Sequence, residues 1–564
     1  MKNKFLLLAI LLVAVSSLFA VPAVPWIVEK TQPDGTKISV YLKGDEKVNW
    51  MESEDGYTLM YDEQRYVVYA QTDRQGNLIP SNIKFGGSTK PNANITKGLF
   101  YSKAQINTLM QIWEMTDDAV IQRAATGNVK MLCILAAFSN RAFVKTQSEF
   151  NNLMNQVGYT TGGAKGSVKD YYLENSYGLL NLQVTVIGTI TLSNTTAYYA
   201  KNPSAFANEV VNLADPLVDY SQFATSGKVN SFHIIFAGYG AESTGDRDNQ
   251  IWSYASSINT TKDGVQLSRY SCSPELRGSS GSNITYIGVI AHEMGHGFGS
   301  PDYYDVSANS GGTNFIGSGN WDLMAGGSWN DGGRQPAHIN PYQKIQFGWI
   351  TPQNLTIGSS VSNIPPSANN PVVYKIKAND NGEHYLLENR QYVGFDASLY
   401  GHGLLIWHIA ANVASSAPND NHPLQVYPVC ASSTTAIPTN TPSSYGTINS
   451  AGCPFPGTSG KTAFSDSSTP QAFTWTVSGK TGILIRNITE NTTTKRVSFD
   501  GYCQPVNFTN QIVTTNTTIT NNCGNINVQN VKVQNGAKLI LDAAGEVNII
   551  SDFDVDLGSE FEIK

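Results

Sequence analysis

The stretch HEMGHGFGSPD, from His292 to Asp302, constrains this chain most strongly because it requires a helix that stops abruptly. His292 and His296 stand four residues apart, so on a helix both side chains lie on one face, about 6 Å apart. Gly299 allows the positive φ of a sharp turn, and Pro301 cannot continue a helix. We therefore expect the chain to turn after His296 and to bring Asp302 back toward the two histidines.

These residue types match the needs of a zinc site. Two imidazoles and one carboxylate supply three ligands and leave a fourth position for water. Glu293 follows His292 directly, so its carboxylate can face such a water and accept its proton. The pattern HExxHxxGxxD requires a glycine and an aspartate at fixed positions after HExxH. This longer pattern predicts a metal-dependent hydrolase.

The composition narrows the class of protein further. Only 14% of the residues are charged, the formal net charge is -7, and no basic block stands out, which argues against nucleic acid as a partner. Glycine, asparagine, serine and threonine are abundant, which favours a β-rich chain with many turns. A chain of 564 residues is too long for one core, and about three or four domains are expected.

The first twenty residues, MKNKFLLLAILLVAVSSLFA, have the pattern of a secretory signal peptide. Two lysines precede an apolar run from Phe5 to Val15, which is too short to span a bilayer comfortably. Small residues near Ala20 predict cleavage there, and Ala23 is an alternative cleavage site. No later segment is long and apolar enough to span, so we expect a protein that is secreted or at the cell surface.

The hydrophobic pattern changes along the chain. Alternating runs such as KISVYL and RYVVYA predict strands over 24–95, and helical spacing follows over 102–123. The next part, to about residue 350, mixes helices with buried strands. Short strands dominate from 351 to about 502 and predict a β-sandwich. The last sixty or so residues give short alternating runs broken by NG, AG and LG, which predict stacked β rungs.

Several segments, in order, resemble one family. HEMGHGFGSPDYYD looks like the immune inhibitor A-like (M6) metallopeptidases, within the metzincin-like group. The resemblance extends to GSVKDYYLENSYGLLNLQVTVIG, HIIFAGYG, NQIWSYASSI, GNWDLMAGGSWN, HINPYQKIQFGWI, EHYLLENRQYVGFDASLYGHGLLIWHIA and the N-terminal QPDGTKISVYLKGDEKVNW. It covers roughly residues 25–500.

The resemblance implies roles for individual residues. Zinc would be bound by His292, His296 and Asp302, with Glu293 as the general base. GNWDLMAGGSWN resembles the segment with the methionine turn, so Met324 would lie beneath the metal as a structural residue. Asp305 is the alternative third ligand. Whichever of the two aspartates does not bind zinc would serve a turn or a structural calcium ion, Ca2+.

The resemblance also implies an α+β multidomain architecture. The expected parts are a signal peptide (1–20), a β-rich prodomain with a linker helix (21–125), a metzincin-like zinc peptidase domain (126–350), a β-sandwich (351–502) and a C-terminal stacked-β module (503–564). The implied protein is a secreted zinc metalloendopeptidase, made as a proenzyme, that is a monomer and cuts proteins or peptides. The C-terminal rungs resemble modules of exported Bacteroidota proteins, which suggests that type of bacterium.

The sequence leaves open how a proenzyme would be kept inactive and whether the protein is an active peptidase. No cysteine precedes Cys133 and no histidine precedes His233. A group from 21–125 that blocks the zinc must therefore be a carboxylate, a backbone group or simple bulk. A binding protein that has lost activity, or a zinc hydrolase acting on something other than peptides, would use the same scaffold. Glu293 favours an active enzyme over the first of these.

Overall fold

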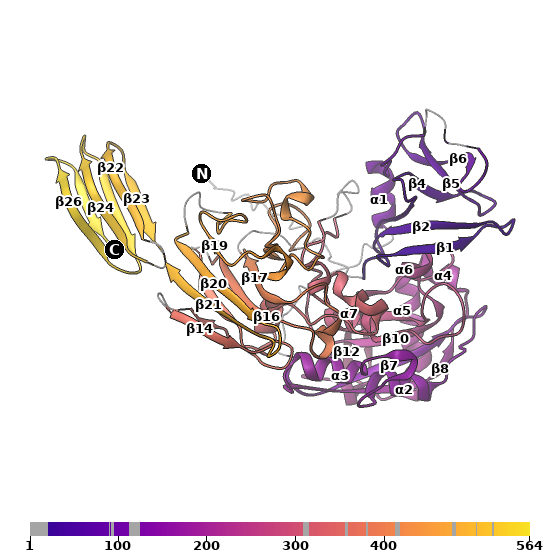
Figure 1. Ribbon diagram of the computed structural model, residues 1–564. Helices are drawn as coiled ribbons and strands as arrows, with labels where there is room; N and C mark the ends of the chain where they lie inside the picture. Colours follow the sequence, from indigo (N-terminus) through magenta and orange to yellow (C-terminus); the bar gives the residue numbers. More distant parts are fainter. Residues whose placement is uncertain are drawn as a thin grey trace, which may run out of the picture.

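The computed structural model describes residues 21–89, 91, 95–111, 125–307, 315–355, 359–378, 382–411, 418–475, 481–503, 505–521 and 524–564. The signal peptide expected at 1–20 lies outside this part. The chain forms an N-terminal domain seated on a central domain, a two-sheet domain beside it, and a C-terminal module at the far end (Figure 1).

The N-terminal domain is one antiparallel sheet whose six strands follow chain order. Turn sequences such as QPDGT join them, and Gly35 there has a φ of 86°. The strands are β1 (Ile27–Thr31), β2 (Lys37–Gly44), β3 (Asn49–Glu52), β4 (Thr58–Tyr61), β5 (Val67–Thr72) and β6 (Leu78–Lys84). Helix α1 (Lys103–Gln111) occupies the first half of the helix expected over 102–123, and the rest of that stretch lies outside the described residues.

The central domain is built on a mixed sheet in the order β11-β12-β10-β7-β8. Its middle strands are parallel and β11 is an antiparallel edge. The apolar run in β7 is buried on both faces, as its sequence predicts. The strands are β7 (Gly127–Ala137), β8 (Leu180–Thr191), β9 (Lys228–Val229), β10 (Phe232–Tyr239), β11 (Tyr254–Lys262) and β12 (Val265–Leu276).

Helices cover this sheet and connect its strands. Helix α7 contacts β12, β11 and β10, while α2 and α3 lie against β8. Capping boxes start two of them, at Thr146 and Ser167. The helices are α2 (Gln147–Asn155), α3 (Val168–Asn175), α4 (Thr196–Ala200), α5 (Pro203–Ala214), α6 (Ala241–Thr244), α7 (Ile287–Gly297) and α8 (Pro341–Gln346).

The next domain has two sheets that share a hydrophobic core. One contains β13 (Gln353–Asn354), β15 (Tyr374–Lys377), β16 (His384–Arg390), β17 (Gly403–Ile409) and β18 (Val426–Pro428). The other contains β14 (Ser359–Ile364), β19 (Phe464–Ser465), β20 (Ile483–Asn491) and β21 (Arg496–Cys503). Leu386 and Trp407 of this domain belong to the same buried cluster as Met324 of the central domain, so the two domains are packed through a continuous core.

The C-terminal module has two parallel three-stranded sheets with a core of their own. The strands are β22 (Val506–Val513), β24 (Ile526–Val533) and β26 (Val547–Val555) in one sheet, and β23 (Thr517–Asn521), β25 (Lys538–Ala543) and β27 (Glu560–Ile563) in the other. Asn507, Asn527 and Asn548 stand in register, and their amides form a hydrogen-bonded ladder at 2.9 and 3.2 Å.

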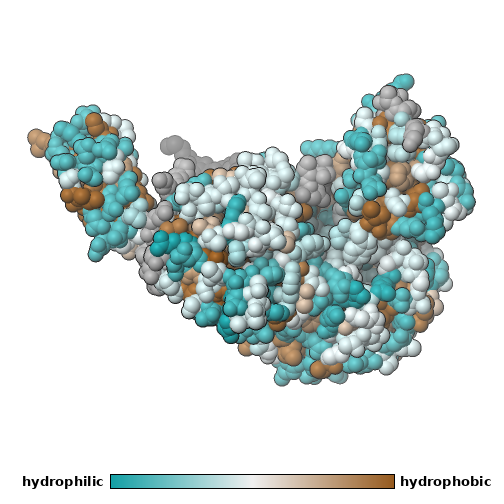
Figure 2. All heavy atoms as spheres, viewed as in Figure 1, coloured by the Kyte–Doolittle hydropathy of each residue, from teal (hydrophilic) through white to brown (hydrophobic). Residues whose placement is uncertain are grey.

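The molecule is thus a mixed α/β, multidomain protein. Hydrophilic and intermediate residues cover most of the face seen in Figure 2, and the hydrophobic ones there form small groups. No helix in the described part of the chain has the length and apolar character needed to cross a bilayer.

Candidate active site

Helix α7 carries the HExxH pattern through the interior of the central domain. The apolar residues before His292 make its first turns part of the core, and the helix is buried from Ile287 to His296. It ends at Gly297, with Phe298 as its C-cap, and Gly299 adopts a φ of 96°. A residue with this φ turns the chain sharply. Glycine suits the position because a side chain at this φ would be strained. The turn brings Asp302 back to the histidines, as its position in the sequence predicts.

The ligand atoms of His292, His296 and Asp302 meet at one point. The two Nε2 atoms are 3.2 Å apart, and Asp302 Oδ1 lies 3.1 Å from Nε2 of His292 and 3.5 Å from Nε2 of His296. Ligands at tetrahedral angles around zinc, with bonds of about 2.0–2.1 Å, are separated by about 3.3 Å. The spacing therefore fits a single small metal ion, and among the described residues these three form the only such cluster.

The surroundings of the three side chains fix their orientation. His292 Nδ1 lies 2.8 Å from the carbonyl of Leu323, and His296 Nδ1 lies 2.8 Å from that of Ser300. Donation from Nδ1–H to these carbonyls leaves each Nε2 unprotonated, as a metal ligand needs. Both oxygens of Asp302 are buried and without a hydrogen-bond partner. An orphaned buried carboxylate is costly, and a cation at this point would satisfy it.

Glu293 is fully buried beside this cluster. Burial raises the pKa of its carboxyl well above the usual range, and Asp302 adds to the shift. Its Oε1 accepts a hydrogen bond of 2.8 Å from the backbone nitrogen of Val21, and its Oε2 has no partner. A carboxyl group in this position lies next to the metal point and can exchange a proton with a group bound there.

Met324 packs against helix α7 and is hydrogen-bonded to the turn that carries Asp302. A Cβ added at Gly295 would come within 2.7 Å of the Met324 sulfur, so Met324 packs directly against Gly295 of the helix. The Met324 carbonyl accepts the backbone N–H of Tyr303 at 2.8 Å, which ties this segment to the turn that holds Asp302.

Asp305 is not part of the cluster. Its Oδ1 accepts the backbone N–H of Ser307 at 2.9 Å and its hydroxyl at 2.6 Å, which closes a local turn. Burial raises the pKa of Asp305 to about 7. Asp302 and Asp305 are thus three residues apart in sequence but occupy different environments.

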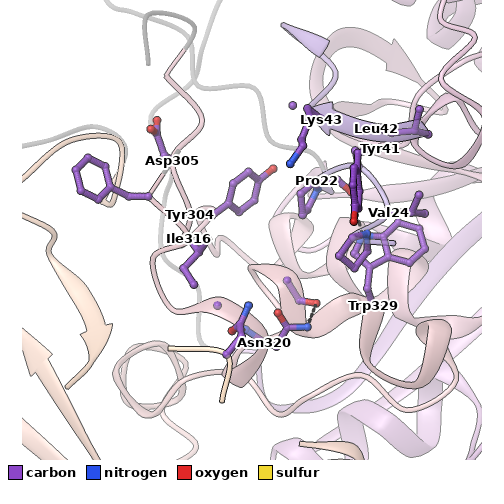
Figure 3. Close-up of a pocket in the computed structure, with 17 residues that line it drawn as sticks. Pro22, Val24, Tyr41, Leu42, Lys43, Tyr304, Asp305, Ile316, Asn320 and Trp329 are labelled. Carbon is purple, nitrogen blue, oxygen red and sulfur yellow. Dashed lines mark hydrogen bonds between the residues drawn. The ribbon is translucent and has the colours of Figure 1, made fainter. Parts of the chain in front are cut away.

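The N-terminal segment lies in the cleft in front of Glu293, a position that no sequence pattern predicts. Trp252 Nε1 donates to the Val21 carbonyl and Trp329 Nε1 to the Pro22 carbonyl, each at 2.9 Å. Val24 N–H donates to the Glu242 carbonyl at 3.0 Å. Figure 3 shows the cavity, of about 270 Å³, that this segment forms with Tyr41 and Lys43 of the N-terminal sheet above Trp329 and Asn320 of the central domain.

A second part of the N-terminal domain reaches the same cleft. In the GDEK turn between β2 and β3, Glu46 and Lys47 are buried although both are charged. Burial raises the pKa of Glu46 to about 8, and the neighbouring Asp45 adds to the shift. Further out, Arg65 pairs with Asp246 of the central domain. The charged turn sequence GDEK was the available signal, but it could not show which surface the turn would meet.

Two histidines and a carboxylate at one point on a helix and the following turn, with a buried glutamate adjacent, are typical of HExxH metallopeptidases. Residues 215–350 match the family model of the immune inhibitor A peptidase M6 catalytic domain. A stretch of 246 residues is 26% identical to Immune inhibitor A of Bacillus thuringiensis subsp. alesti, over 35% of this chain and 33% of that protein.

A second relative gives the same picture. Over 255 residues the chain is 26% identical to Pre-pro-metalloprotease PrtV of Vibrio cholerae serotype O1 (strain M66-2), covering 36% of this chain and 27% of that protein. The match thus spans about a third of these relatives or less. Together the comparisons support an M6-like metallopeptidase. They do not bear on the Bacteroidota-type origin, which stays a prediction from the C-terminal rungs.

Proposed function

We propose that the protein is a secreted zinc-dependent endopeptidase that is made as a proenzyme. The observation that carries the proposal is the meeting of His292, His296 and Asp302 at one buried point, with Glu293 beside it. The M6-like comparisons supply the peptidase class and hence protein or peptide substrates. A monomer with no membrane span is the simplest form of such an enzyme.

The three clustered residues would hold the metal. Asp302 is the better third ligand because its Oδ1 lies 3.1 and 3.5 Å from the two Nε2 atoms, whereas Asp305 lies outside the cluster and its Oδ1 serves a turn. Two imidazoles and one carboxylate suit zinc. A zinc ion bound there supplies a Lewis acid and makes a water nucleophilic near neutral pH. Met324 would support the site from below without reacting.

Glu293 would act as the general base and then as the acid. Its carboxylate accepts a proton from the attacking water as that water adds to the scissile carbonyl. The same carboxyl then passes the proton to the leaving amine.

The proenzyme part of the proposal rests on the cleft being filled by the chain itself. Val21 binds Glu293 through its backbone nitrogen, and the two tryptophans hold the next carbonyls. A backbone group, one of the options left open by the lack of early histidines and cysteines, thus lies where a substrate would bind. If the signal peptide ends at Ala20, this nitrogen is the amino terminus of the proenzyme.

The test compares casein cleavage by the wild type, Glu293→Ala and the exposed control Glu546→Ala at matched zinc content, before and after brief elastase digestion of the N-terminal domain. We expect cleavage by the wild type and the control after digestion, none by Glu293→Ala, and loss of cleavage with a chelator. Equal activity before and after digestion would remove the proenzyme part. No cleavage by zinc-loaded, digested wild type would refute the peptidase proposal.

A further inference from the structure

A second cavity, of about 400 Å³, opens beside the cleft on the far side of Trp329. Its walls include Val289 of helix α7, Leu276 at the end of β12 and Trp329. Arg277 and Arg334 also line it. The apolar walls and the two cationic residues come from the central domain, and Trp26 is the N-terminal domain's contribution.

Two arginines lie together at one end of this cavity. Arg277 and Arg334 both face the ring of Tyr286, with Cζ atoms 4.5 and 5.8 Å from its centroid. Arg334 is paired with Asp331. Arg277 donates to the Tyr286 hydroxyl, and among the described residues no carboxylate oxygen lies within 4.0 Å of its guanidinium nitrogens. Arg277 is partly exposed, so its remaining donors are open to a ligand.

Glu242 is the other acidic group of the cavity, and in the described part of the chain it forms no ion pair with Arg277. Its carboxylate oxygens accept the backbone N–H and the hydroxyl of Ser253 at 3.1 and 2.9 Å. Burial raises its pKa to about 7, which lowers the fraction of Glu242 that is ionised below neutral pH. With Arg334 neutralised by Asp331, Arg277 is the cation left to attract an anion.

The cavity begins next to the proposed general base. Val289 precedes Glu293 by four residues, so the two share a face of helix α7. Tyr286, at the start of that helix, precedes Glu293 by seven residues, or about 10 Å along the axis. An extended peptide covers about 10 Å in three residues. The arginines therefore lie within reach of the first three residues of a chain that leaves Glu293 in this direction.

The N-terminal segment shows that a peptide takes this direction. It starts at Glu293 with the nitrogen of Val21 and passes along Trp329. Trp26 then packs edge-on against Trp329, with ring centroids 5.4 Å apart, and forms one wall of the cavity. The residues after Val21 thus run from the base toward the arginines, which is the course expected for the part of a substrate that follows the scissile bond.

We infer that this cavity is a carboxylate-binding pocket of the enzyme, with Arg277 as its specificity-determining residue. It would select substrates with an acidic group within three residues after the scissile bond. A planar guanidinium suits a carboxylate because it offers paired donors, and its apolar surroundings strengthen the bond. The carboxylate has two sources, an Asp or Glu side chain or a free C-terminus. This inference rests on the proposed function.

The test uses the full chain, loaded with zinc and activated by brief elastase digestion, on a peptide library analysed by mass spectrometry. We expect Asp and Glu in the three positions after the cut to be favoured about tenfold over Asn and Gln. Arg277→Gln should abolish this preference and Arg277→Glu should reverse it toward Lys and Arg. Lys130→Glu, the same charge change at an exposed position on β7 that does not line the cavity, should keep it. Amidated peptides separate the two sources, because only recognition of a free C-terminus is lost on amidation.

Binding provides a readout that does not need catalysis. In digested Glu293→Ala protein, a fluorescent peptide with Asp after the cut position should bind about tenfold more tightly than its Asn counterpart, and Arg277→Gln should remove the difference. Equal cleavage and binding of acidic and amide peptides would overturn the inference while leaving the peptidase intact. Selective binding without cleavage by any variant would instead support the pocket and refute the proposed function.

Discussion

Asp396 links the two-sheet domain to the proposed metal site, and its removal gives a quantitative prediction. The carboxylate binds the buried guanidinium of Arg390 through two bonds of 2.7 and 2.6 Å. It also accepts the backbone N–H of His338 at 2.9 Å. The His338 carbonyl in turn lies 3.4 Å from the nitrogen of Leu323, whose own carbonyl is the partner of His292.

Asp396→Ala should leave the buried guanidinium of Arg390 with one acidic partner among the described residues, Glu388 at 3.1 Å. Breaking a buried ion pair by removing one partner typically costs about 3–5 kcal/mol. The lost acceptor of His338 adds to this, and the remaining Glu388 offsets part of it, so we expect a cost of about 4 kcal/mol. At roughly 2–4 °C per kcal/mol, the melting temperature of the packed central and two-sheet domains should fall by about 10 °C.

The assay is differential scanning calorimetry of the zinc-loaded full chain, with zinc affinity measured in parallel. Zinc affinity should also fall, because His292 loses part of the support for its orientation. The control is Asp554→Ala, which removes an exposed partner of Lys532 and should change stability by less than about 1 kcal/mol. A melting temperature for Asp396→Ala equal to that of the control would refute the reasoning.

Three further predictions concern the site itself. Asp302→Ala should lose stoichiometric zinc by atomic absorption while Asp305→Ala keeps it; the reverse result would make Asp305 the ligand. Gly295→Ala should lower stability by about 1–3 kcal/mol in urea, since its Cβ would meet the Met324 sulfur at 2.7 Å, and adding Met324→Ala should relieve that clash. Glu242 has its pKa raised by burial from 4.5 to about 7, so its contribution to stability is full below pH 4.5 and is lost as pH rises through about 7. The melting temperature of Glu242→Gln, relative to wild type, should therefore rise between pH 5 and 8, and parallel profiles would contradict this.

Much of the site could be predicted from the sequence because its geometry is local. A spacing of four residues puts His292 and His296 on one face of a helix whatever surrounds it. A glycine with positive φ and a proline then end that helix, so the position of Asp302 follows from a short segment. The order of strands in the N-terminal sheet and the parallel rungs at the C-terminus also arise between neighbours in the chain.

Other features depend on contacts between residues that are far apart in the sequence. The contact of Val21 with Glu293 joins residues 272 positions apart, and no local pattern encodes it. The same holds for Asp396, whose acidic character in the sequence gives no sign that it supports a proposed metal ligand from another domain. Arg277 and Arg334 are 57 positions apart and meet only at the ring of Tyr286. Backbone periodicity determines helices, strands and turns, whereas the pairing of distant surfaces follows from burial of the whole chain, which only the tertiary structure decides.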